Sequence, residues 1–306
     1  MTDFEIPRSM SYQDLRADGM TRESIRVSVG AGHLFHARRD VYVRGDCSDR
    51  VLQSARVGGR ADCVSMMREL GVYVLADENS LHVQIPRHRS RLRSPRSRGA
   101  RLDGTAHRVV VHWRDDPSDA DSLIADPVHA VAQAVLCQEV RPAIATLDSA
   151  LNKGVIAEHQ IDALFELIPL NRHAIRRAID GRAEAGPETF ARLICRTFGV
   201  SVELQVRIAG VGRVDLVVDG WIIVECDSRA FHGGWDLQER DRRRDLAAAE
   251  QGYTTLRPTA NHLVWEPGLL LRAVAGLLDR GPRQHDAVIS RRRRRDRGRS
   301  AIRVMN

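Results

Sequence analysis

The stretch from residue 213 to residue 233, RVDLVVDGWIIVECDSRAFHG, constrains the fold of this chain more than any other stretch. Residues 214–218 and 221–226 are rich in β-branched and aromatic side chains, which favour strands. Asp219 and Gly220 lie between these runs, and such a dipeptide is a strong signal for a hairpin turn. The sequence therefore predicts two antiparallel strands that meet at a tight turn.

The length of this turn decides which residues face the acids of the second strand. A two-residue loop, Asp219 and Gly220, would pair Asp215 with Val224 and place it on the opposite face from those acids. A three-residue loop, residues 218–220, with Gly220 left-handed and a bulge, would pair Asp215 with Ile223 instead. We expect the second form, because it gathers the acids on one face.

Side chains alternate along a strand, so Glu225 and Asp227 share that face. Converging carboxylates repel one another in a low-dielectric setting unless a cation neutralises them, and such oxygen ligands suit Mg²⁺ or Mn²⁺. The alternative is a strand-end Asp215 paired with Arg213 or Arg257. Unpaired acids at the end of an apolar run are costly to desolvate, which favours the metal.

The order Asp215, Glu225, Asp227, followed by His232, resembles the PD-(D/E)XK nuclease core. It looks like the uncharacterised-domain branch related to very-short-patch-repair endonucleases, over roughly residues 186–278. The resemblance implies a restriction-endonuclease-like domain, with a mixed sheet between helices, that hydrolyses DNA phosphodiester bonds with a divalent metal.

The resemblance also assigns roles to individual residues. Glu188 matches an acidic residue of the family's opening helix, and Gln205 matches a glutamine of its first strand. Asp215, Glu225 and Glu188 would hold the metal. Asp227 would orient the metal or a water, and His232 would assist proton transfer.

One departure from the family pattern concerns Asp227. The wider nuclease class usually has a lysine at this position, and the only lysine here is Lys153, outside the domain. His232 is therefore the proposed proton carrier. A competing hypothesis is an antitoxin-like DNA-binding regulator whose nuclease fold is inactive.

The amino-terminal region has a different pattern. Residues 12–17 and 21–29 predict two short helices, and residues 34–36 and 41–43 predict a small hairpin. This arrangement resembles the winged-helix domain of AbiEi-type antitoxins, which usually carries a glycine before Val-Tyr. Asp40 stands at that position, so we expect the wing to bend differently.

The winged-helix resemblance implies a DNA-contacting surface. The second helix would present Arg22 and Arg26 to a major groove, and Arg38, Arg39 and Arg44 would lie near phosphates. In the alternative, a winged helix for protein contacts, these arginines are only solvated. A toxin or another protein partner is compatible with either form.

Four segments follow from these patterns: a winged helix (1–50), a mixed middle domain (51–180), a restriction-endonuclease-like domain (181–280) and a basic disordered tail (281–306). The expected fold class is a multi-domain α/β protein. Residues 87–101 form a basic Ser/Pro/Gly loop, which is either mobile or a phosphate-binding element. The net charge of +7 and pI near 9.7 favour nucleic acid as the partner.

The cysteines and histidines suggest no metal site. Five cysteines without a C-x-x-C pair are typical of free thiols in a reducing cytosol, and neither a disulfide framework nor a zinc site is expected. No run approaches a membrane span, so we expect a cytoplasmic protein. Several histidines of the middle region are scattered without ligand spacing: His107, His112, His129, His159 and His173.

Overall fold

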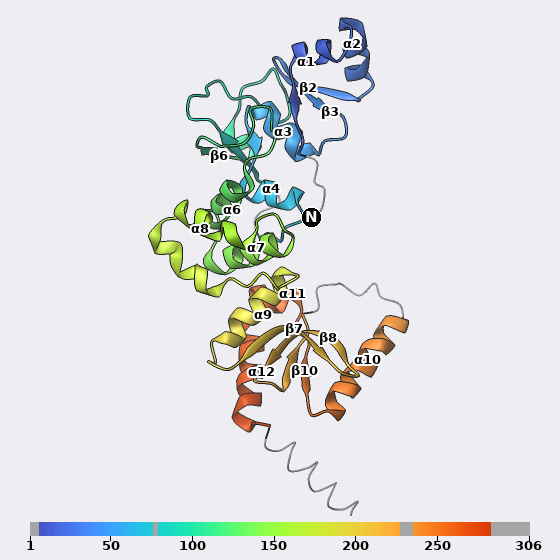
Figure 1. Cartoon of the computed structure of the whole chain (residues 1–306), viewed down its shortest axis with the longest axis vertical. Helices are drawn as coiled ribbons and strands as arrows, with labels where there is room; N and C mark the ends of the chain where they lie inside the picture. Colours follow the sequence, from blue (N-terminus) through green and yellow to red (C-terminus); the bar gives the residue numbers. More distant parts are fainter. Residues whose placement is uncertain (1–5, 76–78, 227–234, 283–306) are drawn as a thin grey trace, which may run out of the picture. The chain divides into compact units, whose positions relative to one another are not determined.

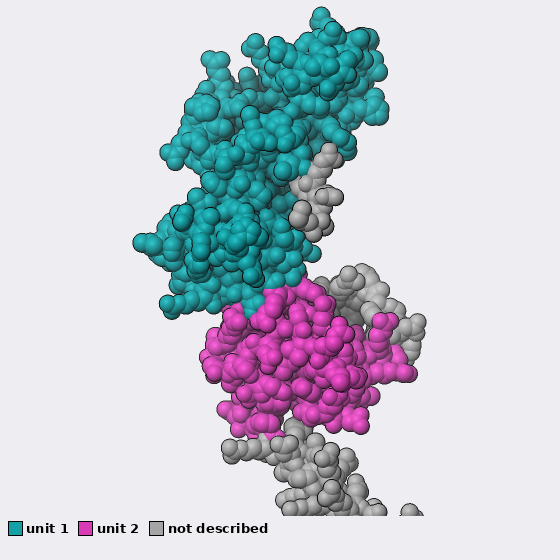
Figure 2. All heavy atoms as spheres, in the orientation of Figure 1, with its two compact units in different colours: residues 1–181 teal, residues 182–306 magenta. Residues whose placement is uncertain are grey.

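The computed structural model describes residues 6–75, 79–226 and 235–282. It divides the chain into two compact units, Met1–Gly181 and Arg182–Asn306 (Figure 2). Both units contain helices and β-sheet, with two of the described sheets in unit 1 and one in unit 2, which confirms the predicted multi-domain α/β class. Among the described helices, none has the length and apolar character needed to cross a membrane.

Unit 1 begins with two helices and a three-stranded antiparallel sheet of order β1-β3-β2 (Figure 1). The elements are β1 (Ser9–Met10), α1 (Tyr12–Ala17), α2 (Arg22–Gly30), β2 (Leu34–Arg38) and β3 (Val41–Arg44). Leu15, Ile25 and Leu34 are buried together and hold the helices against the hairpin. The two predicted helices and the predicted hairpin are therefore present.

Side-chain caps and one left-handed residue define these elements. Ser11 and Thr21 cap α1 and α2 by accepting backbone N–H groups of the first turns. Asp40, in the turn between β2 and β3, has a φ of 55°. This is the left-handed conformation that glycine favours, and Asp40 Oδ1 also accepts the Tyr12 N–H at 2.8 Å. The turn between β2 and β3 thus has a glycine-like backbone at an aspartate.

The rest of unit 1 packs helices around a second three-stranded sheet, of order β4-β5-β6. In this sheet β4 and β5 are antiparallel, and β5 and β6 are parallel. Leu81, Val83 and Ile85 alternate with polar residues along β5 and form a buried core with Val57. The elements are α3 (Asp49–Val57), β4 (Arg60–Ala61), α4 (Cys63–Glu69), β5 (Leu81–Ile85), α5 (Gly104–His107), β6 (Val109–Trp113), α6 (Pro127–Leu136), α7 (Val140–Asn152), η1 (Glu158–Gln160), α8 (Ile161–Glu166) and η2 (Leu170–Ala178).

Unit 2 is a four-stranded mixed sheet of order β10-β9-β8-β7 between helices. Strands β7, β8 and β9 are antiparallel neighbours, whereas β10 joins β9 in parallel. Figure 1 shows α9 and α12 on one side of the sheet and α10 on the other. The elements are α9 (Gly186–Arg196), β7 (Val202–Ile208), β8 (Gly212–Val218), β9 (Ile222–Val224), α10 (Trp235–Glu250), β10 (Thr254–Leu256), α11 (Ala260–Trp265) and α12 (Pro267–Arg280).

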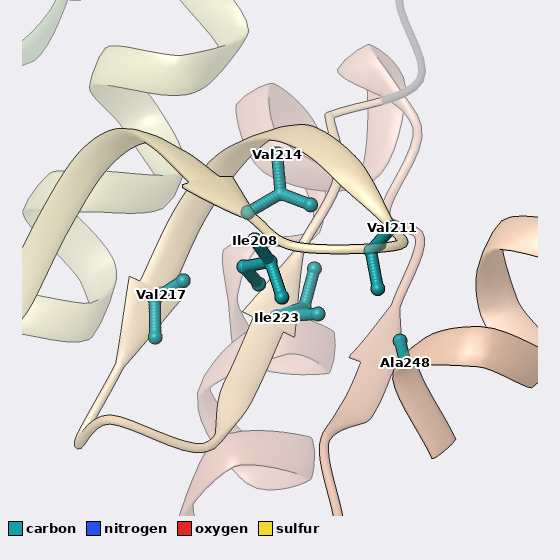
Figure 3. Packing of buried hydrophobic residues seen from close by; sticks show 6 residues of the cluster. All are labelled: Ile208, Val211, Val214, Val217, Ile223 and Ala248. Atoms are coloured by element: carbon teal, nitrogen blue, oxygen red, sulfur yellow. The ribbon is translucent and has the colours of Figure 1, made fainter. Parts of the chain in front are cut away.

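An aliphatic cluster fixes the strands that carry the predicted acids. Ala248 of α10 packs with side chains of the strands and the β7–β8 loop (Figure 3). Fully burying one such Val or Ile side chain contributes roughly 1.5–3 kcal/mol, so the cluster holds β8 and β9 in one register. Its members are Ile208, Val211, Val214, Val217, Ile223 and Ala248.

Candidate functional site

The turn between β8 and β9 differs from both predicted forms. Val218 pairs with Ile222, so the loop has three residues, 219–221. Asp219 and Gly220 have φ values of 51° and 73°. The Trp221 N–H donates to the Val218 carbonyl at 3.2 Å, and its indole N–H donates to Asp219 Oδ2 at 3.2 Å. Trp221 therefore belongs to the turn and not to the strand, which was the error in both predicted registers.

This register places Asp215 opposite Glu225, one residue pair away from the predicted pairing with Ile223. The partner of Asp215 thus moves by two residues along the second strand, and a shift of two residues leaves both acids on one face of the sheet. The Asp215 N–H donates to Glu225 Oε2 at 3.4 Å, and the Cys226 N–H donates to Asp215 Oδ2 at 2.7 Å. The structure thus brings these two predicted site residues into direct contact.

Glu188 and Gln205 join the same group from α9 and β7. The Glu188 side chain is buried, and its Oε2 accepts from Gln205 Nε2 at 2.8 Å and from the Glu184 N–H at 3.0 Å. Gln205 has a φ of 55° and interrupts the β7–β8 ladder at the position opposite Asp215. Gln205 of β7, Asp215 of β8 and Glu225, which follows β9, therefore lie at one level of the sheet.

Burial makes ionisation unfavourable for all three acids. It raises the pKa of Glu188 to about 7, with the charge of Asp215 as the next cause. The pKa of Asp215 is also raised by burial, against the hydrogen bond from Cys226. Burial and then the charge of Asp215 raise the pKa of Glu225, against the effect of Arg244. The group is therefore short of positive charge.

Arg244 of α10 supplies one compensating charge. Its guanidinium donates to Glu225 Oε1 at 2.8 Å and to the carbonyl oxygens of Val211 and Arg213 at 3.1 and 2.6 Å. The Arg244 guanidinium also lies 3.9 Å from the Asp241 carboxylate on the same helix. Glu225 is thus partly neutralised by a cation of the chain itself.

The arginines considered as alternative partners of Asp215 are engaged elsewhere. Arg213 pairs with Glu184 at 2.7 Å, and Arg257 pairs with Asp245 at 2.8 Å. Among the hydrogen bonds that the structure describes, Asp215 accepts none from a guanidinium. An arginine pair therefore does not account for this half-buried acid.

The residues present suit a hard cation only in part. Gln205 Oε1 is buried and has no hydrogen-bond partner among the described residues. The described hydrogen bonds to Asp215 and Glu188 engage Oδ2 and Oε2, so one oxygen of each remains for a ligand. Over the described part of the chain, however, the three carboxylates do not form a group whose ligand atoms all lie within 4.8 Å. Binding of a cation would require the three carboxylates to move closer together and Arg244 to release Glu225.

Two predicted site residues lie outside the described residues, namely Asp227 and His232. The site therefore depends on Asp215 and Glu225, which are in contact, and on Glu188, which is bonded to Gln205.

A basic surface in unit 1 extends from the β2–β3 hairpin to the loop of residues 87–101. Burial lowers the pKa of Arg38, and the charges of Arg89 and Arg93 lower it further, so three guanidinium groups are neighbours. Arg98 contacts His36 of the wing, and Arg39 is exposed.

The loop that carries these arginines is tied to the unit. The Arg93 N–H donates to the Val57 carbonyl at 3.2 Å, and the Ser94 N–H donates to the Ala100 carbonyl at 3.0 Å. Leu92 packs against the buried cluster of β5. The loop thus holds its arginines at a defined place beside the wing.

The other arginines predicted to contact DNA differ in their surroundings. Arg22 is exposed on α2. Arg26 pairs with Glu23, with Nε to Oε2 at 3.0 Å, and Arg44 pairs with Asp46 at 2.7 Å. Exposed pairs of this kind contribute only about 0–1 kcal/mol, so a phosphate can replace the carboxylate.

A second cluster was missed from the sequence. Cys63, His82, His112 and Cys137 place one ligand atom each within 4.8 Å of all the others. His112, which the sequence offered no reason to group with other ligands, therefore belongs to a cluster that could hold a metal ion. The residues lie far apart in the sequence and on four different elements, so no short spacing could indicate them.

Comparison with known proteins adds relatives without a described activity. No family model matches the chain. An uncharacterized protein of Mycobacterium tuberculosis strain CDC 1551 / Oshkosh, MT2308, is 32% identical over 157 residues, which cover 45% of this chain and 55% of the relative. The uncharacterized protein Rv2248 of strain H37Rv matches with the same values. The chain thus spans about half the length of the curated relatives it matches.

Proposed function

We propose that unit 2 is a nuclease-like domain that binds Mg²⁺ or Mn²⁺ at Asp215, Glu225 and Glu188 and hydrolyses DNA phosphodiester bonds. The observation that carries this proposal is the gathering of one buried acid, Glu188 of α9, and two half-buried acids, Asp215 of β8 and Glu225 after β9, whose pKa values are all raised. Such a charge deficit at adjoining strand ends favours a cation site over a structural ion pair.

The residues of the chain divide the chemistry among them. When bound, the cation would lower the pKa of a water and stabilise charge on the phosphate oxygens. Glu188, whose pKa is raised to about 7 when no cation is bound, would give up its proton and serve as a ligand, and His232 would assist proton transfer. Gln205 Oε1, which lacks a donor among the described residues, can accept a hydrogen bond from the attacking water. The Cys226 N–H holds the Asp215 carboxylate in position by donating to its Oδ2.

Unit 1 would deliver the DNA. Arg38, Arg89 and Arg93 lie together beside exposed Arg39, and a concentration of guanidinium groups at a wing suits phosphate binding. The net charge of +7 supports the same partner.

Cleavage of supercoiled plasmid in Mg²⁺ or Mn²⁺ tests the enzymatic part. Asp215→Asn keeps an acceptor for the Cys226 N–H, and Glu188→Gln keeps one for Gln205, so both variants should fold but lose cleavage. Glu203→Gln, at an exposed position of β7, is the matched control and should cleave like the wild type. Equal cleavage by all four proteins would indicate a contaminating nuclease and remove the support for the proposal.

A second function is favoured by the pair between Arg244 and Glu225. If this guanidinium permanently takes the place of the cation, the domain is an inactive scaffold and the chain is a DNA-binding regulator. DNA bound in a mobility-shift assay but left uncut by the wild type in both metals would identify the regulator.

A further inference from the structure

Four side chains of unit 1 converge from separate elements. Cys63 is the first residue of α4, and Cys137 follows the last residue of α6. His82 lies on β5 and His112 on β6. Their ligand atoms all lie within 4.8 Å of one another, so short side-chain movements would let two thiols and two imidazoles share one ion.

The sheet explains why the two imidazoles meet. β5 and β6 are parallel, with His82 opposite Val110 and His112 opposite Gln84. The two histidines are thus offset by two residues on the same face, and diagonal neighbours of this kind are within reach of long side chains. His82 Nδ1 lies 3.1 Å from His112 Nε2.

The backbone around Cys63 is arranged to aim its sulfur at the imidazoles. Cys63 has a φ of 53°, which a residue with a side chain adopts only when its surroundings impose it. The Asp62 N–H donates to the His82 carbonyl at 3.2 Å, and the Ser65 hydroxyl accepts the His82 N–H at 2.9 Å. These bonds fasten the start of α4 to β5, so the left-handed turn places Cys63 beside His82.

The distances fit tetrahedral coordination. With Zn–N near 2.0 Å and Zn–S near 2.3 Å, neighbouring ligand atoms of a tetrahedron lie ~3.3 to ~3.8 Å apart. The separation between His82 and His112 is 3.1 Å, and Cys137 Sγ lies 3.9 Å from His112 Nε2. Shifts of an ångström or less would complete the site. Gln133 Nε2 lies 3.5 Å from Cys137 Sγ and can stabilise a thiolate from outside the coordination shell.

We propose that Cys63, His82, His112 and Cys137 bind one Zn²⁺ in a closed tetrahedral site. Two thiolates and two neutral imidazoles are the donor set that zinc prefers, whereas Mg²⁺ and Mn²⁺ prefer oxygen. Because four protein ligands fill the coordination shell, the ion is structural and ties α4, β5, β6 and α6 together. The exposed position of Cys137 gives the ion a path into the site.

A disulfide between the cysteines is the alternative. It would leave both imidazoles at the same point without a role, although their ring nitrogens converge on the sulfurs. The geometry therefore favours the metal, and the two states are separable by experiment.

The metal content of the purified full-length chain, prepared under reducing conditions, tests the site directly. We expect about one zinc per chain, loss of zinc in Cys137→Ser, and full retention in Cys47→Ser, which removes a thiol outside the cluster. Asp215→Asn should also retain zinc, because it alters only the acids of unit 2. A Cys137→Ser protein that keeps the wild-type zinc content would overturn the proposal.

Cobalt replacement keeps the test independent of whether Cys137→Ser folds. The wild-type chain loaded with Co²⁺ should show the visible bands of tetrahedral cobalt and a sulfur-to-cobalt charge-transfer band. Bound zinc should protect Cys63 and Cys137 from alkylation while Cys47 reacts, as read by peptide mapping. A wild type that holds no zinc and gives no cobalt–thiolate band, or that carries a disulfide between Cys63 and Cys137 after reducing purification, contradicts the proposal.

Discussion

Replacing Glu188 by glutamine should stabilise unit 2 above neutral pH. Burial raises the pKa of this carboxyl from 4.5 to about 7. Since one pKa unit corresponds to about 1.4 kcal/mol, ionising Glu188 in the folded state without a cation costs about 3 kcal/mol. Glutamine removes this cost and keeps an oxygen that accepts from Gln205 Nε2 and the Glu184 N–H.

The sign of the pH dependence follows from proton binding. The folded pKa is the higher one, so the folded state holds a proton that the unfolded state has lost between pH 4.5 and 7. Protonated Glu188 therefore makes its full contribution to the free energy of unfolding below pH 4.5, and this contribution is lost as the pH rises through 7. The advantage of Glu188→Gln should therefore grow by about 2–3 kcal/mol between pH 5 and pH 8.

Hydrogen exchange of the β8 and β9 amides, read by mass spectrometry in EDTA and corrected for the intrinsic pH dependence of exchange, measures this difference within unit 2. Glu203→Gln, at an exposed site on β7, should show no comparable change. Added Mg²⁺ should narrow the gap at pH 8 by stabilising only the wild type. An advantage of equal size at pH 5 and pH 8, or a loss of protection at pH 8, would refute the assignment of Glu188 as an uncompensated buried acid.

Three further expectations concern charge. Arg39→Gln should reduce the slope of log K against log salt for DNA binding by about 1. Arg26→Gln should reduce this slope by less, because Arg26 already pairs with Glu23. Fluorescence anisotropy of labelled DNA in a salt series compares the two variants. Arg244→Gln should lower protection of β8 in EDTA and increase the gain from Mg²⁺, since it removes the cation that competes for Glu225; equal gains would contradict this. Mg²⁺ binding at pH 7 should release a fraction of a proton from Glu188, seen by calorimetry in buffers of different ionisation enthalpy, and the release should vanish in Glu188→Gln.

The hairpin acids could be predicted because they depend on local pattern. Asp215 and Glu225 lie ten residues apart in one hairpin, so strand alternation decides their faces once the turn is known. The exact pairing was wrong because Trp221 looks like a strand residue, yet its backbone and indole N–H groups both bond within the turn. The alternation of side chains along a strand cannot reveal hydrogen bonds that Trp221 makes within the turn.

The cysteine and histidine cluster was unpredictable for the opposite reason. Its residues come together only after β5 and β6 pair in parallel and α4 and α6 pack beside them. Parallel pairing needs a long crossover, so its register is not encoded by a turn. The φ of Cys63 is likewise imposed by its surroundings, and nothing in its neighbours along the chain indicates it.

Charge balance links the acids of unit 2 to the choice between the two proposed functions. Glu188, Asp215 and Glu225 carry three negative charges when ionised, and Arg244, which the carbonyls of Val211 and Arg213 also hold beside them, contributes one positive charge. The remainder equals the charge of one divalent cation. In its absence Glu188 holds a proton near neutral pH, which lowers the deficit. An inactive scaffold would have no physical reason to keep Glu188 buried beside Asp215, since an apolar or amide side chain would avoid the desolvation cost. The uncompensated acids therefore favour a site that a cation occupies during function.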